Sequence, residues 1–228
     1  MTMPQPPAPV VVDLWARRVA DVPGGHDLLD AHERGTLATF TSATTAMSYA
    51  AGHVLARRAV ASVVGAPAAS LRFERTCSTC GGPHGRPVLT DPDGVHVSLS
   101  RCDAWVAVAT CADLPVGVDI ESIEAVDFPG FAPVAQHPAD REARNPGPPG
   151  LAQQRAVSWV RKEAALKAVG VGLRADPADV RTPLSGIPAD LLGDGTWVTV
   201  QDVPLPWPEA VAAVAVAGRA IPVTIRQH

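Results

Sequence analysis

The stretch Ser158–Leu173, SWVRKEAALKAVGVGL, holds Lys162 and Lys167, the only two lysines among the nineteen Lys and Arg residues of the chain. Trp159, Glu163 and Lys167 follow one another at intervals of four residues, so in a helix they lie along one face. Small or apolar residues fill most of the remaining positions, and Gly-Val-Gly is typical of a helix end and turn. The stretch therefore predicts a helix that carries an acid and a base on one face.

A second informative stretch is Val116–Ser122, VGVDIES, in which apolar and polar residues alternate. In a strand this pattern puts Asp119 and Glu121 on the same face, roughly 6 to 7 Å apart at their Cα atoms. The two carboxylates fit either the solvated face of a half-buried strand or a site for a hard cation such as Mg²⁺. The Glu163–Lys167 pair, taken alone, fits an ordinary surface ion pair worth roughly 0.2 to 0.5 kcal/mol.

The remaining segments alternate between helical and strand-like patterns. Residues 27–40 predict a helix, and residues 41–65 predict a second one that opens on Ser/Thr capping residues and ends at a glycine. VHVSLS and AWVAVAT, separated by Arg101-Cys102-Asp103, predict a hairpin. The Pro- and Gly-rich residues 129–150 predict a mobile loop or irregular insertion. Further strands are predicted around WVTVQDV, AVAAVAVA and the terminal PVTIRQH.

Each half of the chain thus contains a helix followed by strands. At 228 residues and 23.7 kDa the chain is long enough for one large domain or two of about 110 residues. The pattern predicts an α+β protein of two similar subdomains, residues 1–114 and 115–228.

Composition restricts the classes of function. The net charge of -4 and the pI near 5.9 argue against a general nucleic-acid binder, so any anion must be held locally. We expect a cytoplasmic protein without membrane contact, because the N-terminus has no basic leader and no segment reaches about 18 uninterrupted apolar residues. The bias to Ala, Val, Pro, Gly and Arg fits a GC-rich coding sequence, in which Arg tends to replace surface Lys. The two lysines that the chain retains are therefore candidates for a specific role. The alternative is that two lysines lie close together by chance.

The four cysteines fit reduced thiols in such a compartment. CSTCGGPHG offers Cys77, Cys80 and His84 as half of a zinc site, with Cys102 or Cys111 as a fourth ligand. A single Cys-x-x-Cys is also compatible with free thiols or with a redox-active pair.

VGVDIE followed some forty residues later by WVRKEAALKAVGVGL, with GRP and VSLS upstream, closely resembles the 4′-phosphopantetheinyl transferases of the Sfp type. The family signatures are a Gly-x-Asp-(Ile/Val)-Glu strand and a Trp/Phe-x-x-Lys-Glu-Ala-x-x-Lys-x-x-Gly-x-Gly helix, and the chain matches both. The resemblance runs from about Leu28 to Ala217 and implies two subdomains in a pseudo-twofold arrangement.

The resemblance implies that the phosphopantetheine arm of coenzyme A is moved onto a serine of an acyl or peptidyl carrier protein, with release of adenosine 3′,5′-bisphosphate. It implies that Asp119, Glu121 and Glu163 hold Mg²⁺, with Mn²⁺ as the alternative. Glu163 would act as the base directly or through a water, and Lys167 would contact the pyrophosphate. Lys162 corresponds to a family lysine near the phosphates.

The expected coenzyme A contacts in the other half are Arg86 of GRP, Ser100 and Arg101. Two departures from the family bear on the 3′-phosphate: Arg101 stands where a histidine is usual, and Ser48 where an arginine is common. Arginine binds phosphate well, so retained binding of the 3′-phosphate with altered geometry is expected, the alternative being a hairpin-turn arginine in solvent.

The resemblance also implies a monomer that serves carrier domains of peptide synthetases, polyketide synthases or fatty-acid synthesis. Independently of the resemblance, Phe128 and Phe131 are expected to be exposed, and we therefore expect apolar surface of the loop near residues 128–135 and of the adjoining helix to recognise the carrier. The alternative function is a degenerate relative that binds coenzyme A or a carrier protein without turnover, an interpretation that rests on Arg101 and Ser48.

Overall fold

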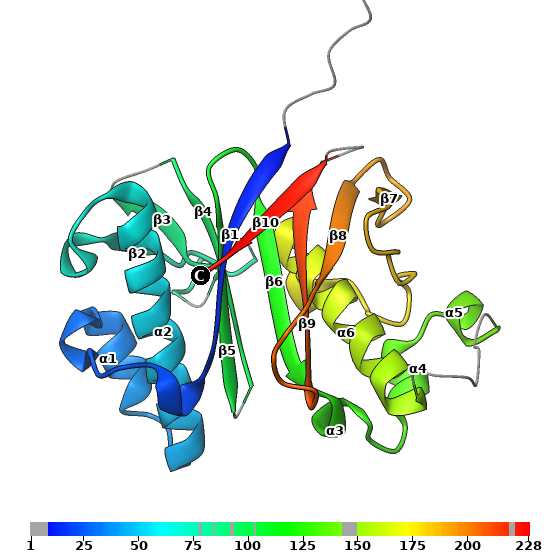
Figure 1. The fold of residues 1–228 in the computed structure, drawn as a ribbon, viewed down its shortest axis with the longest axis horizontal. Helices are drawn as coiled ribbons and strands as arrows, with labels where there is room; N and C mark the ends of the chain where they lie inside the picture. Colours follow the sequence, from blue (N-terminus) through cyan, green and yellow to red (C-terminus); the bar gives the residue numbers. More distant parts are fainter. Residues whose placement is uncertain are drawn as a thin grey trace, which may run out of the picture.

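The protein is described here from a computed structural model that covers residues 9–77, 79–83, 85–91, 94–102, 104–142, 150–218 and 222–228. Two β-sheets lie side by side at the centre and a long helix covers the outer face of each (Figure 1). The strands are β1 (Val10–Arg18), β2 (Arg72–Glu74), β3 (Val88–Asp91), β4 (His96–Arg101), β5 (Trp105–Cys111), β6 (Val116–Ser122), β7 (Ala189–Asp190), β8 (Trp197–Val203), β9 (Ala210–Ala217) and β10 (Val223–Gln227).

The α-helices are α1 (Ala31–Leu37), α2 (Ala43–Val64), α3 (Ile123–Val126), α4 (Phe131–Ala135), α5 (Pro138–Glu142) and α6 (Leu151–Ala168). Short 3₁₀ turns are η1 (Val19–Asp21), η2 (His26–Leu28), η3 (Ala68–Ser70) and η4 (Gly172–Arg174). This mixture of helices and sheets confirms the predicted α+β class. Among the described residues, no helix has both the length and the apolar character needed to cross a membrane.

The predicted helix over residues 41–65 is confirmed in detail as α2. The side chain of Ser42 accepts a hydrogen bond from the backbone N–H of Thr45, as an N-cap does. Gly65 ends the helix in the left-handed conformation with φ of 68°, which glycine adopts without the steric cost that a Cβ brings. Between these caps the helix packs on β4 and β5.

The predicted helix over residues 27–40 is shorter than expected. The chain forms the turn η2, and α1 begins only after Asp30, whose side chain and that of Glu33 form a reciprocal capping box. Glu33 is 1 % exposed, and its carboxylate is also bound by His53, Arg57 and Arg75. This buried cluster ties α1 to α2 and to the segment after β2.

The first sheet has the strand order β10-β1-β5-β4, and the second has the order β6-β9-β8-β7. The predicted hairpin is the antiparallel pair β4–β5. The second sheet is antiparallel throughout, and α6 packs on its outer face through Ala164, Ala165 and Ala168. The inner faces of the two sheets share one apolar core, to which β1, β5, β6 and β9 contribute.

The last strand returns to the first half of the chain. β10 pairs in parallel with β1, with Val223 opposite Val10 and Gln227 opposite Leu14. The first sheet is therefore built from both ends of the chain. The expected division after residue 114 stays a prediction, and β10 is a strand from the second part that lies in the first sheet.

The Pro- and Gly-rich insertion is more regular than expected. In place of an irregular loop, residues 129–142 form the short helices α4 and α5, while residues 143–149 lie outside the described part of the chain. Phe131 anchors α4 because its ring packs edge-on against Trp159 of α6, with centroids 6.3 Å apart. The prediction that both phenylalanines of this segment are exposed is wrong for Phe131, which is 1 % exposed, while Phe128 is 41 % exposed.

Candidate active site

Two adjoining cavities lie where the two halves of the chain meet. We call the smaller, of about 350 Å³, the carboxylate pocket; its lining residues are Leu99, Ser100, Arg101, Asp119, Glu121, Trp159, Glu163 and Lys167. We call the larger, of about 1030 Å³, the cationic pocket; it is lined by Thr76, Cys77, Thr79, Cys80, Gly85, Arg86, Pro87, Ser98, Leu99, Lys167, Gly170, Val171, Gly172 and Arg174. Leu99 and Lys167 belong to both, so the two pockets share a wall.

Strand β6 and helix α6 bring the acidic residues together because the backbones approach unusually closely. A Cβ atom added at Gly117 would lie 2.0 Å from the carbonyl oxygen of Ala164 and 2.6 Å from the backbone nitrogen of Ala168. Only glycine fits in this place. Asp119, two residues further along the same face of the strand, therefore faces the α6 side that carries Glu163.

The carboxylate of Asp119 is held on one of its two oxygens. Lys167 Nζ donates to Oδ1 at 2.6 Å, and the hydroxyl of Ser100 donates to the same oxygen at 2.7 Å. Lys167 Nζ also donates to the carbonyl oxygen of Val118 at 3.2 Å. Oδ2 of Asp119 is buried and has no hydrogen-bond partner among the described residues.

Glu163 is the second acid of the pocket. Its Oε1 atom is buried and, within the described part of the chain, also lacks a hydrogen-bond partner. Burial raises the pKa of Glu163 above its usual value, and the nearby Asp119 carboxylate raises it further, while Lys167 counteracts this effect. A carboxyl group with a raised pKa is suited to accept a proton near neutral pH.

The donor set fits a hard cation in part. Asp119 Oδ2 and Glu163 Oε1 are buried oxygens at one pocket, and neither has a hydrogen-bond partner in the described part of the chain. Mg²⁺ commonly takes one or two carboxylates and completes its shell with water and phosphate oxygens. Glu121 lines the same pocket. Nowhere in the described ranges, however, do three His, Cys, Asp or Glu side chains gather closely enough to hold a metal ion by themselves.

Arg101 lies at the pocket and is not a solvated turn residue. Its guanidinium lies over the rings of Phe40 and Tyr49, 5.8 and 5.5 Å from the centroids, and donates to Ser48 Oγ at 3.3 Å. The two positions that depart from the family therefore touch each other. Ser48 is 1 % exposed, so it helps to hold the Arg101 head group against α2.

The cationic pocket carries Arg86, Lys167 and Arg174 and no carboxylate among its lining residues. Arg86 donates to the carbonyl oxygen of Lys167 at 3.4 Å, across the junction of the two halves. Arg174 folds back on its own turn, donating to the carbonyl oxygens of Val171 and Gly170 at 3.0 Å. Sequence reasoning missed Arg174; the available signal was its place directly after the Gly-x-Gly-Leu that ends the helix motif.

Lys162 is not brought to either pocket. Its side chain is fully buried, and Nζ donates to the carbonyl oxygens of Ala135 at 2.8 Å and Pro177 at 2.9 Å. The carboxylate of Asp140 lies 3.5 Å away. Lys162 thus joins α6 to α4, α5 and the segment that follows η4.

The cysteines remain four thiols, all within described residues, and they form no disulfide. Cys77 and Cys80 line the cationic pocket. His84, the histidine of the alternative zinc hypothesis, lies outside the described residues, and that hypothesis stays untested. Cys102 is half-buried near the active site; burial, with a smaller effect of the Glu121 charge, raises its pKa to about 11, so it is a protonated thiol.

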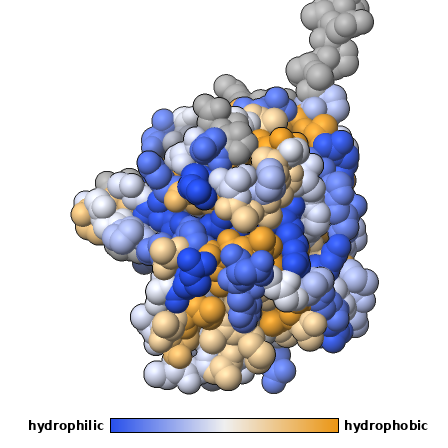
Figure 2. Space-filling model, turned by 90° about the vertical axis from the view of Figure 1, so that its left-hand side faces the viewer, coloured by the Kyte–Doolittle hydropathy of each residue, from blue (hydrophilic) through white to orange (hydrophobic). Residues whose placement is uncertain are grey.

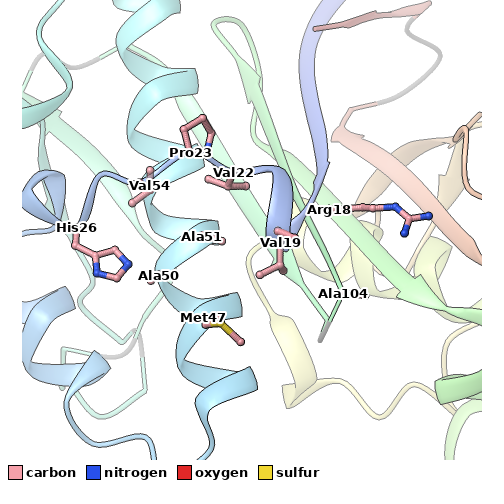
Figure 3. A pocket seen from close by; sticks show the side chains of 12 residues that line it. Arg18, Val19, Val22, Pro23, His26, Met47, Ala50, Ala51, Val54 and Ala104 are labelled. Carbon is pink, nitrogen blue, oxygen red and sulfur yellow. The ribbon is translucent and has the colours of Figure 1, made fainter.

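A separate cavity of about 510 Å³ lies between α2 and the chain that follows β1 (Figure 3). Met47, Ala51 and Val54 of α2 line it together with Val19 and Val22, and its ionisable lining residues are Arg18 and His26. The side of the molecule that carries α1 and α2 shows hydrophobic patches between hydrophilic areas (Figure 2). Among the described residues that line this cavity none carries a carboxylate, so they supply no carboxylate ligand or base for the chemistry described above.

Comparison with known proteins adds one match. Residues 115–197, from the start of β6 to the start of β8, match the family model of the 4′-phosphopantetheinyl transferase superfamily. No curated protein matches the chain. The matched segment contains Asp119, Glu121, Glu163 and Lys167 and leaves the first 114 residues uncovered. The part of the chain that supplies the acidic side chains of the carboxylate pocket is thus similar to the 4′-phosphopantetheinyl transferase superfamily, and this match supports a transferase of that kind.

Proposed function

We propose that the protein transfers the 4′-phosphopantetheine arm of coenzyme A to a serine hydroxyl of an acyl or peptidyl carrier protein, as an Sfp-type enzyme. One observation carries the proposal. Asp119 Oδ2 and Glu163 Oε1 are buried carboxylate oxygens without a hydrogen-bond partner among the described residues, and their pocket shares Lys167 with a larger pocket lined by cationic side chains. Acidic oxygens beside a cation-lined cleft suit a pyrophosphate together with a divalent metal.

In the proposed reaction the carrier serine oxygen forms a bond to the β-phosphorus, and the bond from that phosphorus to the bridging oxygen breaks. Adenosine 3′,5′-bisphosphate leaves with the bridging oxygen, and the serine proton passes to the Glu163 carboxylate, directly or through a water. The raised pKa of Glu163 supports this role. Lys167 would oppose the negative charge that develops on the leaving group; its place in the lining of both pockets supports this role.

Asp119 and Glu163, with Glu121 as a third member, would hold Mg²⁺ or Mn²⁺, which when bound would neutralise charge on the pyrophosphate. For coenzyme A we propose the guanidinium groups of Arg86, Arg101 and Arg174 as phosphate contacts, since the first and last line the cationic pocket and Arg101 the carboxylate pocket. We leave Lys162 out of this site because its side chain is fully buried and its Nζ donates to the backbone carbonyl oxygens of Ala135 and Pro177.

We further propose that the enzyme is a cytoplasmic monomer and that its carriers belong to peptide, polyketide or fatty-acid synthesis. The resemblance to the Sfp type supports this assignment. Residues 1–114 and 115–228 would then supply the adenosine side and the metal side of the cleft. Phe128 stays a candidate for carrier contact because it is 41 % exposed, whereas buried Phe131 does not.

The test is intact-mass spectrometry of an apo carrier protein incubated with coenzyme A, Mg²⁺ and the wild-type protein. We expect the carrier to gain the mass of one phosphopantetheine group, and chelation of the metal to abolish the gain. Glu163→Gln keeps the shape and removes the base, so it should lose at least a hundredfold in rate. Glu124→Gln makes the same charge change at an exposed position of α3 and should retain the wild-type rate.

Two outcomes would contradict the proposal. If several carriers gain no mass while calorimetry still detects coenzyme A binding, the protein is a binding protein and not a transferase. If Glu163→Gln transfers as fast as the wild type, the carboxylate pocket is not the site of proton transfer.

A further inference from the structure

The two sheets meet at their edges without a backbone ladder between them. β4 is the edge strand of the first sheet and β6 the edge strand of the second, and the two pack side by side. Edge strands leave backbone groups without partners, so a junction of this kind needs other polar contacts. Two serine hydroxyls of β4 provide such contacts.

Ser98 and Ser100 both point from β4 towards β6, since alternate residues of a strand share a face. Ser98 is 3 % exposed, and its hydroxyl oxygen accepts a hydrogen bond from the backbone N–H of Val118 at 3.0 Å. Ser100 is 6 % exposed, and its hydroxyl donates to Asp119 Oδ1 at 2.7 Å. The first serine thus binds the backbone of β6, and the second binds a side chain of the active site.

Lys167 completes a three-membered chain of hydrogen bonds. Its Nζ donates to Asp119 Oδ1 at 2.6 Å and to the hydroxyl oxygen of Ser100 at 3.3 Å. Because Ser100 accepts from the ammonium, its own proton is directed to Asp119. The two donors reach Oδ1 from different elements, β4 and α6, and together they fix the rotation of the carboxylate about its Cβ–Cγ bond. The other carboxylate oxygen of Asp119, Oδ2, has no hydrogen-bond partner among the described residues.

We propose that Ser100 is a positioning residue for Asp119: it holds Oδ1 so that Oδ2 is presented as a ligand for a divalent cation. The assignment rests on the proposed function, in which Asp119 is a metal ligand. It differs from the role that the family resemblance implies for Ser100, which is contact with coenzyme A. Groups that hydrogen-bond to a metal ligand commonly change metal affinity by 10- to 100-fold when removed.

The experiment measures binding of Mn²⁺ alone, by the electron paramagnetic resonance signal of the free ion, to the full-length protein and three variants. Ser100→Ala removes the hydroxyl and little else, while Ser100→Thr restores a hydroxyl at the same place. Ser98→Ala is the matched control for Mn²⁺ binding alone, because Ser98 lines the cationic pocket and its buried hydroxyl belongs to the same strand and junction but binds the backbone of Val118 in place of Asp119. Thermal unfolding of each variant is recorded beside the titration.

We expect Ser100→Ala to weaken Mn²⁺ binding by about tenfold or more and Ser100→Thr to recover most of it. Ser98→Ala should bind Mn²⁺ within about twofold of the wild type although it loses thermal stability, since a buried backbone N–H is left without its acceptor. Comparable weakening in Ser98→Ala and Ser100→Ala would show a general loss of the junction and would overturn the assignment.

A second measurement separates the two roles of Ser100. If Ser100→Ala binds Mn²⁺ normally but coenzyme A at least tenfold more weakly in calorimetry, Ser100 is a ligand residue and the positioning role is wrong. A wild-type protein that transfers phosphopantetheine yet binds Mn²⁺ no better than its Asp119→Asn variant would also overturn the role, while leaving the proposed function standing. If the wild-type protein binds Mn²⁺ and this binding requires Ser100, but no phosphopantetheine is transferred, the positioning role stands and the proposed function is wrong.

Discussion

Lys167 and Asp119 form an ion pair across two elements, with Nζ 2.6 Å from Oδ1, although 48 residues separate them in the sequence. Asp119 is 2 % exposed, so water has little access to its carboxylate, and Lys167 is the cationic group paired with it. The pair has a structural role beside the chemical one. It fastens the last turn of α6 to β6 at the place where the two halves meet.

We predict that Lys167→Met lowers the free energy of unfolding by about 2 to 3 kcal/mol, because it leaves a buried carboxylate without its counter-charge. Asp119→Asn in the same background should restore part of this loss, since the uncompensated charge is then gone. Urea denaturation of the two single variants and the double variant gives the coupling energy. Additive losses would mean that the two side chains do not stabilise each other.

Glu33 should make stability depend on pH. Burial by itself would raise its pKa, but the hydrogen bonds from His53 and Arg57 and from the backbone of Asp30 outweigh burial and lower the pKa to about 2, from the usual 4.5. A lowered pKa in the folded state contributes stability that is present above the unfolded value and is lost as the pH falls towards the folded value.

We therefore predict that Glu33→Gln is about 3 kcal/mol less stable than the wild type at pH 7 and that the difference narrows between pH 4.5 and pH 2. Glu74→Gln, a change of the same kind on exposed β2, should differ little at any pH. Chemical denaturation at a series of pH values measures both. A difference for Glu33→Gln that stays constant down to pH 2 would contradict the lowered pKa.

Arg174 tests the cationic pocket. Arg174→Gln should weaken coenzyme A binding in calorimetry by about tenfold, or about 1.4 kcal/mol, because one charged hydrogen bond to phosphate is lost. Arg161→Gln makes the same substitution on α6, where the arginine pairs with Asp202 and lines neither pocket. If both variants weaken binding equally, the effect is one of overall charge and Arg174 is not a specific contact.

Gly117 tests the close approach of β6 and α6. A Cβ at this position would meet backbone atoms of α6 at 2.0 and 2.6 Å, so one of the two elements must shift. We expect Gly117→Ala to lower stability by about 3 kcal/mol or more. Gly35→Ala places a methyl group in open space on helix α1 and should be neutral or slightly stabilising. Equal melting temperatures for the two variants would argue against the packing described here.

Thiol reactivity should distinguish the cysteines. With a pKa of about 11, Cys102 is ionised to only about one part in a thousand at pH 8, whereas Cys80 is exposed. Brief alkylation of the folded protein, followed by peptide mass mapping, should therefore label Cys80 well before Cys102. In urea all four should react at similar rates. Rapid labelling of Cys102 in the folded protein would contradict its burial.

Local patterns in the sequence were sufficient for much of the fold. Ser42 and Gly65 mark the ends of α2 because capping chemistry depends on adjacent residues. The alternation of β6 correctly separated core-facing Val118 from Asp119 because the two faces of a strand follow directly from its period of two. The same alternation and the four-residue spacing on α6 gave the face of each element that carries Asp119, Glu163 or Lys167, but only the family resemblance implied that the two faces meet in one pocket.

The errors concern partners that are distant in the sequence. The family resemblance implied a place near the phosphates for Lys162, but its Nζ donates to the carbonyl oxygens of Ala135 and Pro177. Both partners are distant in the sequence, so the residues around Lys162 could not predict these contacts. Phe131 looked exposed because its segment is rich in Pro and Gly, yet it packs on Trp159. The pairing of β10 with β1 could not be derived either, because its hydrogen bonds join backbone groups that every sequence has.

The pairing of β10 with β1 also has a consequence for synthesis on the ribosome. Residues 10–18 emerge about 200 residues before their parallel partner at residues 223–227. Until then β1 has only β5 beside it and keeps an open edge, to which another strand could bind. Closing so long a loop is slow, so completion of the first sheet should be a late step of folding, after α6 and the second sheet have formed from contacts closer in sequence.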